Sequence, residues 1–277
     1  MIKGKMIVLC LIFSGCILTI AYAKDQTYTV GVVPQFDARK IQRIWQPILK
    51  AVSKSSGVRL KLKGSPNIPK FEKEFNTGKF DFAYMNPYHL IVADKYQGYE
   101  PLVRDVGRKL FGVLVVRKDS PIKRVEDLDG KTIAFPSPNA LGAALIPRAE
   151  FSRKFKINVN PRYVKSHSSV YLNVVLGQTD AGGGVQKTFE QQPSKIKDSL
   201  RIFYQTTKVA PHPIAVHPRV GKVDREKVMN AFLKLGTTDK GKVMLAKVPI
   251  KRIGKATMSD YDPLRAMKLE EFYVKEK

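Results

Sequence analysis

The feature that most constrains the fold is the alternation of strand-like and helix-like segments from residue 27 onward. Strand-like segments, rich in β-branched or alternating apolar residues, occur at Thr27–Val33, Val58–Lys63 and Phe80–Met85. Segments with apolar residues at helical spacing follow them at Ala38–Lys54, Ile68–Thr77 and Pro87–Tyr96. This order, βαβαβα, predicts a parallel sheet with helices on both faces.

The pattern then restarts, which predicts a second lobe. Two further strands are expected at Glu100–Arg104 and Phe111–Arg117. Strands follow at Lys131–Phe135, Arg162–Lys165, Asp180–Gly184 and Leu200–Thr206, with helices at Ala140–Phe155, Ser169–Gly177 and Thr188–Gln192. A short strand at Pro213–Val216, a helix at Arg225–Leu235 and a helical tail at Tyr261–Val274 finish the chain.

We therefore predict an α/β fold of two lobes, and the length of 277 residues fits two domains of roughly 100–200 residues each. Residues 24–112 and 213–277 are expected to form the discontinuous first lobe, and residues 113–212 the second lobe with the hinge crossings. The chain is expected to cross between the lobes near Phe111–Arg117 and again near Thr207–Val216.

The N-terminal residues have the parts of a secretory signal peptide. Lys3 and Lys5 precede an apolar run from Met6 to Ala21, and Ala21-Tyr22-Ala23 forms a small-x-small cleavage site. An uncleaved anchor is the first alternative, although the run is marginally short of the about 20 residues that span a membrane. Lipidation at Cys16 is the second. We prefer a signal peptide of residues 1–23, cleaved after Ala23, and an exported protein.

Cysteine content and net charge exclude several classes of function for this protein. Cys10 and Cys16 both lie in the predicted signal peptide, which excludes disulfides, thiolate catalysis and cysteine metal sites in the mature chain. The chain has 49 Lys and Arg against 24 Asp and Glu, a formal charge of +25. An exported protein does not meet the genome, and the lysines are scattered rather than interleaved with aromatics. No nucleic-acid partner is predicted.

A ligand site is expected between the lobes, because ligands of open α/β sheets gather at the carboxyl ends of strands. From the first lobe we single out Gln35 and Phe36 after the first strand, and Tyr84, Asn86 and Tyr88 around the third. The tyrosines would donate hydrogen bonds while covering apolar ligand surface. Asn86 before Pro87 fits a helix N-cap equally well.

The second lobe offers three further candidate segments. Ser137, Asn139 and Ala140 open a long helix, whose free amides and dipole suit an oxyanion, although serine and asparagine are also ordinary caps. His167 and Ser168 precede another helix. Gly183 lies within three consecutive glycines, which permit either close approach of a ligand or tight packing.

Catalytic and metal signatures are not found. The sequence contains no GxSxG, HExxH or P-loop pattern. His212 and His217 are five apart across a predicted strand, so they face opposite sides and cannot share an ion. We predict no enzyme activity, no metal and no cofactor.

The chain resembles a known family along nearly all of its mature length. The matching segments, in order, are DFAYMNPYHL (81–90), GVLVVRKDSPI (112–122), GKTIAFP (130–136), YVKSHSSVYLNVV (163–175), AGGGVQKTF (181–189) and PHPIAVHPRV (211–220). They resemble the phosphate/phosphite/phosphonate-binding periplasmic proteins of ABC transporters, the PhnD-like branch of type II solute-binding proteins. The resemblance implies two α/β lobes joined by two crossing strands that act as a hinge.

The resemblance also implies roles for single residues. The family's tyrosine after the third strand falls on Tyr84, and its cleft histidine falls on His167. Its Ser/Thr-rich helix start falls on 139–142, where Asn-Ala-Leu-Gly lacks the hydroxyls. The acidic residue of aminophosphonate binders falls within Gly182–Gly184 and is missing.

The expected function is that of an exported, monomeric solute-binding protein. It would carry a small, anionic, phosphonate- or phosphate-like ligand to an ABC transporter permease in the inner membrane. The alternative is a periplasmic receptor of the same fold that serves a membrane sensor kinase.

Overall fold

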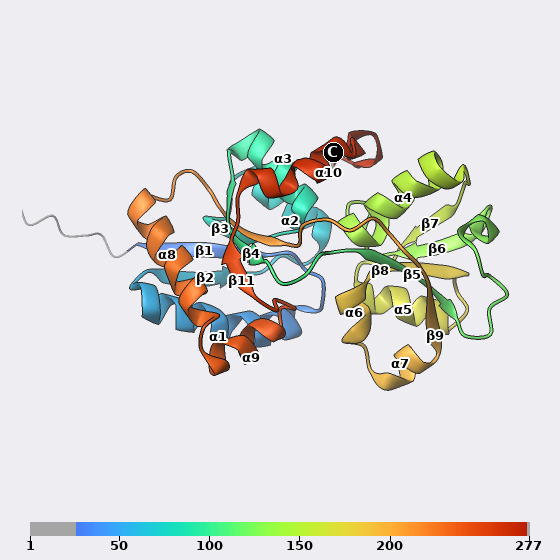
Figure 1. Ribbon diagram of the computed structural model, residues 1–277, viewed down its shortest axis with the longest axis horizontal. Coiled ribbons are helices and arrows are strands. Elements are labelled where there is room, and N and C mark those ends of the chain that lie inside the picture. The colour runs from blue at the N-terminus through green and yellow to red at the C-terminus, as the bar shows by residue number, and fades with distance from the viewer. Residues whose placement is uncertain (1–25, 276–277) are drawn as a thin grey trace, which may run out of the picture.

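The computed structural model describes residues 26–275 and contains two β-sheets that lie side by side, each covered by helices (Figure 1). The first sheet has the order β11-β4-β10-β3-β1-β2 and the second has the order β7-β6-β8-β5-β9. The first is made of β1 (Thr27–Val32), β2 (Arg59–Lys63), β3 (Phe82–Tyr84), β4 (Glu100–Asp105), β10 (Pro213–Val216) and β11 (Ile253–Lys255). The second is made of β5 (Gly112–Arg117), β6 (Thr132–Phe135), β7 (Asn160–Tyr163), β8 (Ala181–Val185) and β9 (Leu200–Gln205).

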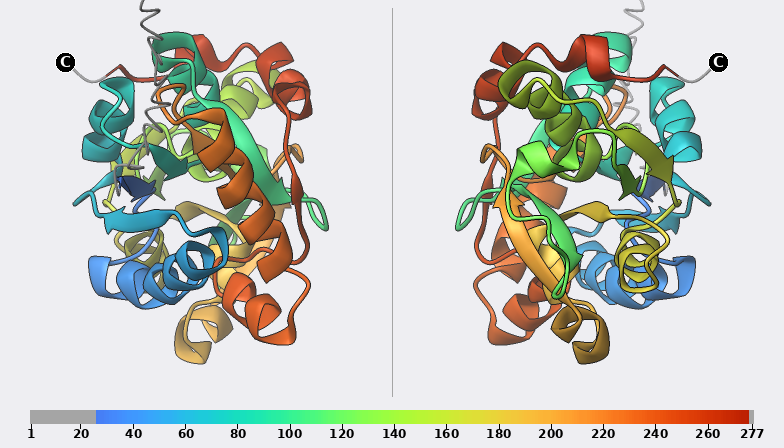
Figure 2. Two further views of the ribbon diagram at one scale, coloured as in Figure 1. Left: turned by 90° about the vertical axis from the view of Figure 1, so that its left-hand side faces the viewer. Right: turned by 90° about the vertical axis from the view of Figure 1, so that its right-hand side faces the viewer.

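Helices cover both faces of the first sheet. The first-lobe helices are α1 (Ala38–Ser56), α2 (Ile68–Asn76), α3 (Pro87–Gln97), α8 (Lys222–Leu235), α9 (Asp239–Ala246) and α10 (Asp262–Ala266). Helices α1 and α8 pack together on one face, and α2 and α3 lie on the other (Figure 2). Asp37 caps α1 by accepting from the Lys40 amide, and Gly57 at φ 72° ends the helix.

The second sheet is covered in the same way. One continuous helix spans residues 141–155, with π-helical turns at Leu141–Leu145 and Phe151–Phe155 on either side of α4 (Ile146–Glu150). The opposite face carries α5 (His167–Val175), α6 (Gln186–Glu190) and α7 (Ser194–Asp198) (Figure 1). Short 3₁₀ turns occur at Val125–Leu128, Met258–Tyr261 and Leu269–Phe272.

The two crossings between the lobes pair with each other. Leu110 and Val209 exchange both backbone hydrogen bonds, at 2.9 and 2.8 Å. β5 pairs with β8 and β9 in the second sheet, whereas β10 pairs with β3 and β4 in the first. The chain therefore passes between the sheets just before Gly112, beside the expected crossing near Phe111–Arg117, and again between Gln205 and Pro213. The lobe boundaries at 112 and 213 remain a prediction.

The structure also departs from the predicted elements. β10 is antiparallel to both its neighbours and β5 is antiparallel to β8 and β9, so neither sheet is wholly parallel. The sequence pattern missed α7, α9 and β11, which are short and carry little apolar periodicity. The predicted signal peptide, with Cys10 and Cys16, lies outside the described residues. Within residues 26–275, no helix has both the length and the hydropathy needed to cross a membrane.

The C-terminal segment leaves the first lobe and reaches the second. Arg153 donates to the carbonyls of Met267 and Lys268 at 2.6 and 2.7 Å, and it pairs with Glu271. In Figure 1 this red segment lies between α3 and α4. The chain end is thus a third connection between the lobes, beside the two crossings.

Candidate functional site

A small cavity lies where the two lobes meet. Its wall is formed by Val33, Gln35, Ile68, Asn86 and His212 of the first lobe or its crossing, and by Ala140, Leu141, Gly142, Ala143, His167 and Val185 of the second. The volume is about 20 Å³. A water molecule needs about 10–15 Å³ on this measure, so the cavity has room for about one water in this arrangement of the lobes.

The first-lobe wall contributes amide and imidazole groups. Asn86 caps α3 by accepting from the His89 amide at 2.8 Å, and its Nδ2 donates to the Asn139 carbonyl at 3.2 Å. Gln35 Nε2 lies 3.3 Å from His212 Nε2. Asn86 is therefore both a helix cap and a cavity residue, so its two predicted roles coexist.

Two buried histidines face the cavity. Burial lowers the pKa of His167 to about 4. Burial, together with the neighbouring His89 and His167 rings, lowers the pKa of His212 to about 3. His167 Nδ1 lies 3.2 Å from Thr188 Oγ1, which orients the ring. Both imidazoles are neutral at pH 7 and act as hydrogen-bonding groups rather than cations.

The second-lobe wall is the start of the helix that spans residues 141–155. Ala140 occupies the N-cap and makes no side-chain capping hydrogen bond. The first amides of a helix have no acceptor within the helix, and the dipole makes this end positive. Because Ala140, Leu141, Gly142 and Ala143 all line the cavity, the helix start can offer backbone donors to an oxyanion.

The described residues of the cavity wall include no Lys, Arg, Asp or Glu. A ligand here would therefore meet neutral donors and acceptors only. Among residues 26–275, no group of three or more His, Cys, Asp or Glu side chains is placed to hold a metal ion.

The structure brings together four of the predicted site residues: Gln35, Asn86, Ala140 and His167. Phe36 and Tyr84 line a second cavity of about 20 Å³, which shares Val33 and Gln35 with the first.

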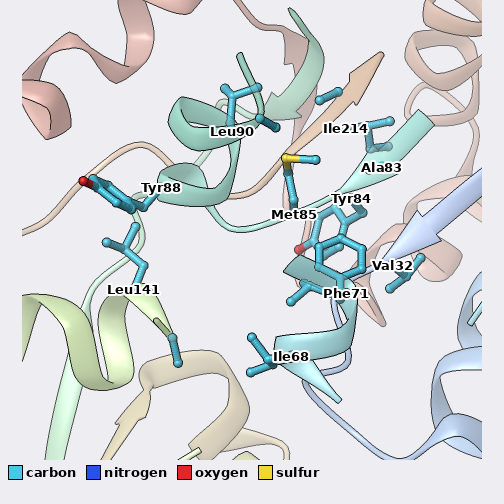
Figure 3. Close-up of a cluster of buried hydrophobic side chains, with 14 of the residues drawn as sticks. Val32, Ile68, Phe71, Ala83, Tyr84, Met85, Tyr88, Leu90, Leu141 and Ile214 are labelled. Atoms are coloured by element: carbon cyan, nitrogen blue, oxygen red, sulfur yellow. The ribbon is translucent and has the colours of Figure 1, made fainter. Parts of the chain in front are cut away.

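Tyr84 lies behind His212 rather than on the wall of the interlobe cavity. Its side chain is 5% exposed, and its ring stacks on His212 with centroids 5.2 Å apart and packs against Trp45 at 4.9 Å. The hydroxyl donates to the Val248 carbonyl at 3.4 Å. Figure 3 shows Tyr84 within a cluster of buried apolar side chains that also includes Leu141 of the second lobe. Burial and packing make Tyr84 a core residue that supports the His212 ring.

The remaining predicted residues do not line this cavity. Tyr88 packs against Tyr273, with ring centroids 5.5 Å apart. The Ser137 hydroxyl is buried and has no hydrogen-bond partner in the described part of the chain. Ser168 is exposed. A Cβ on Gly183 would stand 2.0 Å from the Ala143 carbonyl, so close packing within the second lobe explains this glycine.

Asn139 bridges the lobes instead of lining the cavity. Its Nδ2 donates to Glu72 Oε2 at 2.9 Å and to the Val274 carbonyl at 2.8 Å, and its Oδ1 accepts from the Val274 amide at 2.9 Å. The side chain is buried, at 1% exposure. Its polar groups are therefore satisfied by protein partners.

Sequence reasoning missed His212 as a cavity residue. The sequence pattern pointed to His212 only as a candidate metal ligand, because the rule that ligands gather at the carboxyl ends of strands favours residues that follow strands. His212 precedes β10, which is antiparallel to β3, so the start of β10 lies at the same edge as the end of β3. The pairing direction of β10 would have identified this residue.

Comparison with known proteins decides the family. A family model described as "ABC transporter, phosphonate, periplasmic substrate-binding protein" matches residues 30–261. The chain belongs to this family. It is 23% identical over 249 residues to the phosphonates-binding periplasmic protein of Escherichia coli, a match that covers 84% of this chain and 73% of the relative.

Two solved structures of binding proteins share the fold. The binding protein component of a Pseudomonas aeruginosa ABC phosphonate transporter matches with a TM-score of 0.75 and 19% identity, over 87% of this chain and 85% of that one. PhnD1 of Prochlorococcus marinus, in complex with methylphosphonate, matches with a TM-score of 0.78 and 18% identity, over 88% and 97%. These matches confirm the two-lobe, type II binding-protein fold.

Family membership confirms the predicted class of function. The chain is a periplasmic substrate-binding protein of an ABC transporter family, which receives a small-molecule ligand and works with a transporter. The alternative, a receptor for a sensor kinase, is not favoured by these matches.

Proposed function

We propose that this protein binds a small oxyanion of the phosphonate or phosphate class in the interlobe cavity. The observation that carries the proposal is the start of the helix at Leu141, where an alanine N-cap leaves the first amides free to bind a ligand. The Escherichia coli relative is a phosphonates-binding protein and the Prochlorococcus marinus structure holds methylphosphonate, which supports the same class of ligand here.

The electrostatics of the wall favour an anion over a cation. A cationic ligand needs a carboxylate or a cluster of carbonyls, and the described wall has no carboxylate. The helix start provides a positive dipole end, and Gln35 and Asn86 carry amide groups that can donate hydrogen bonds. Such hydrogen bonds are stronger in a water-poor site than at the surface, so neutral donors suffice for a small anion.

Binding requires the lobes to separate from the arrangement described here. The cavity of about 20 Å³ accommodates one water, and a phosphonate is several times larger. The two paired crossings at Leu110 and Val209 are the short segments about which such a movement would occur. We therefore propose that the hinge opens to admit the ligand and then closes on it to an arrangement less tight than the one described here.

Delivery and location follow the family. We propose that the closed, loaded protein docks on an ABC transporter permease in the inner membrane as a monomer and releases its ligand chemically unchanged. Cleavage of residues 1–23 after Ala23 would free it in the periplasm, where its relatives work. No enzymatic step is part of this proposal.

A thermal-shift panel tests the ligand class. Phosphate, phosphite, alkylphosphonates, sulfonates and carboxylates are compared with neutral sugars and cationic amines at constant ionic strength. A bound ligand at a hundred times its Kd stabilises the folded protein by about 2.7 kcal/mol, which raises Tm by roughly 5–10 °C. We expect this shift with at least one phosphorus oxyanion. A comparable shift with a sugar or an amine, and none with any anion, contradicts the anion proposal.

A further inference from the structure

Another, larger cavity lies beside the hinge. It has a volume of about 520 Å³ and is open to solvent. Its lining comes from the two crossings, the end of β8, α6 and the loop before β11. The lining residues are Gly107, Arg108, Lys109, Leu110, Phe111, Val185, Gln186, Lys187, Glu190, Lys208 and Lys251. We call it the hinge groove. It shares Val185 with the interlobe cavity, so the two sites are adjacent but distinct.

Positive charge is concentrated in the hinge groove. Five of its eleven lining residues are cationic, Arg108, Lys109, Lys187, Lys208 and Lys251. The whole chain has 49 Lys and Arg in 277 residues, a frequency that predicts about two in a set of this size. Glu190 is the one carboxylate of the lining, and it pairs with Lys187. The groove therefore has an excess of positive charge that its own lining does not neutralise.

A buried carboxylate holds two of these cations in place. Asp105, 2% exposed, accepts from the backbone amides of Gly107 and Lys251 at 2.8 Å and of Arg252 at 3.0 Å. Arg108 Nε lies 3.0 Å from Asp105 Oδ2, the oxygen that also accepts from the Lys251 amide, as an ion pair. Asp105 thus fixes both the turn that carries Arg108 and the backbone of Lys251. Such a cross-link makes the two residues part of a preorganised site rather than of a loose surface.

The pairing of the two crossings positions two more cationic residues of the hinge groove. In this antiparallel pairing Phe111 stands opposite Lys208, and the Lys208 ammonium lies 5.4 Å from the centre of the Phe111 ring. Lys109, in the same crossing as Phe111, also lines the groove. The Gln186 amide donates to the Phe111 carbonyl at 3.5 Å, which holds α6 and its Lys187 beside the crossing.

We propose that the hinge groove binds a small polyanion that carries two or more phosphate-like groups. The cations come from both crossings and both lobes, so a ligand that neutralises them must extend across the groove, as a chain of linked phosphates does. The Arg108 guanidinium suits a phosphate oxygen pair, and the lysines supply point charges around it. The interlobe cavity, at about 20 Å³ with a neutral wall, does not suit such a ligand.

Titration calorimetry of the whole mature chain with inorganic triphosphate, at constant ionic strength, tests the proposal. We expect one triphosphate site per chain, and in competition titrations orthophosphate should displace bound triphosphate at least about tenfold more weakly than triphosphate binds. The double variant Lys208→Glu/Lys251→Glu should weaken triphosphate binding by about tenfold or more, because each reversal turns an attraction into a repulsion. The control Lys61→Glu/Lys118→Glu makes the same charge change at exposed positions outside the groove and should stay within about twofold.

Three results would overturn the proposal: no heat with triphosphate, an equal loss in the control variant, or one-for-one displacement of triphosphate by methylphosphonate. An equal loss would show a diffuse effect of the basic surface, and displacement would place the anion in the interlobe cavity. If the reversal variant does not fold, Lys208→Gln/Lys251→Gln replaces it, with an expected loss of about threefold. The displacement experiment separates the two sites, because methylphosphonate is the ligand class proposed for the interlobe cavity and not for the hinge groove.

Discussion

Asn139 of the second lobe and Glu72 of the first form a buried hydrogen bond across the lobe boundary, with Nδ2 and Oε2 2.9 Å apart. Both side chains are at most 2% exposed. Glu72 Oε1 is paired with His89 Nε2 at 2.8 Å, so each oxygen of this carboxylate has one partner. A buried carboxylate that loses a partner is costly. Glu72 Oε2 therefore keeps its hydrogen bond to Asn139 only while the two lobes are closed.

Removal of the Asn139 side chain should favour open lobes. Asn139→Ala deletes the donor to Glu72 and both hydrogen bonds to the Val274 backbone, which costs the closed arrangement about 1–3 kcal/mol. Small-angle X-ray scattering without ligand should then give a larger radius of gyration than the parent protein. Asn173→Ala is the control, because Asn173 bonds the Ser169 carbonyl within its own helix. An unchanged radius of gyration for Asn139→Ala, or an equal increase for Asn173→Ala, would show that the Asn139 side chain does not hold the lobes closed.

Arg153 should hold the C-terminal segment against the second lobe. Arg153→Gln loses the charged donor to the Met267 and Lys268 carbonyls, an effect of about 1 kcal/mol for an exposed group. Hydrogen exchange of the amides in 269–274 should accelerate by about fivefold, while α8 is unaffected. Arg162→Gln, which removes a 3.4 Å contact to the Gln178 carbonyl inside the second lobe, should change nothing in that segment. Equal exchange rates of the amides in 269–274 for the parent and for Arg153→Gln would show that Arg153 does not hold this segment against the second lobe.

Acid should destabilise the protein through His167 and His212. Their native pKa values of about 4 and about 3 lie below the unfolded value of about 6.5, so the unfolded state binds more protons between pH 6.5 and pH 4. The free energy of unfolding then falls as pH falls through this window, by up to roughly 1.4 kcal/mol per pH unit for each histidine. Urea unfolding at several pH values, for the parent and for His167→Gln/His212→Gln, isolates this contribution.

The double variant should show a smaller loss of stability between pH 6.5 and pH 4. His217→Gln serves as the control, because His217 is more exposed and does not line the cavity. Parallel pH profiles for the parent and the double variant would show that the two histidines do not govern acid sensitivity.

Tyr84 should behave as a core residue. Tyr84→Ala removes the ring that packs between Trp45 and His212 and should cost about 3–5 kcal/mol of stability. Tyr84→Phe keeps the ring and loses only a long hydrogen bond to Val248, so its cost should be below about 1 kcal/mol. Chemical denaturation measures both. A stable Tyr84→Ala variant with weakened ligand binding would instead support the role that the family resemblance implied.

The sequence pattern predicts the fold well because hydrophobic periodicity reports local structure. Most of the α-helices and most of the strands follow from it, and the parallel arrangement of β1, β2 and β3 is as the alternating order implies. The antiparallel direction of β5 and β10 was not foreseen, since periodicity contains no information on how a strand returns from a second lobe.

The candidate site was predicted less completely, and the reasons differ by residue. Ala140 and His167 line the cavity, as helix starts after strands should. Asn139 is adjacent in sequence to Ala140, yet its side chain points into polar partners on the other lobe. Gly183 is required by packing against Ala143. A sequence places a residue near the mouth of a sheet, but tertiary contacts decide whether it meets the ligand or the protein.

The most direct test of the central claim is titration calorimetry of the ligand-free protein with methylphosphonate at constant ionic strength, with a neutral sugar and a cationic amine as comparisons. The interlobe site predicts one methylphosphonate per chain, displaced by excess phosphate, and no heat from the sugar or the amine. Binding should weaken in His167→Ala, because His167 lies on the wall of the cavity. Saturable binding of the sugar or the amine, with no binding of any phosphorus oxyanion, would contradict the claim.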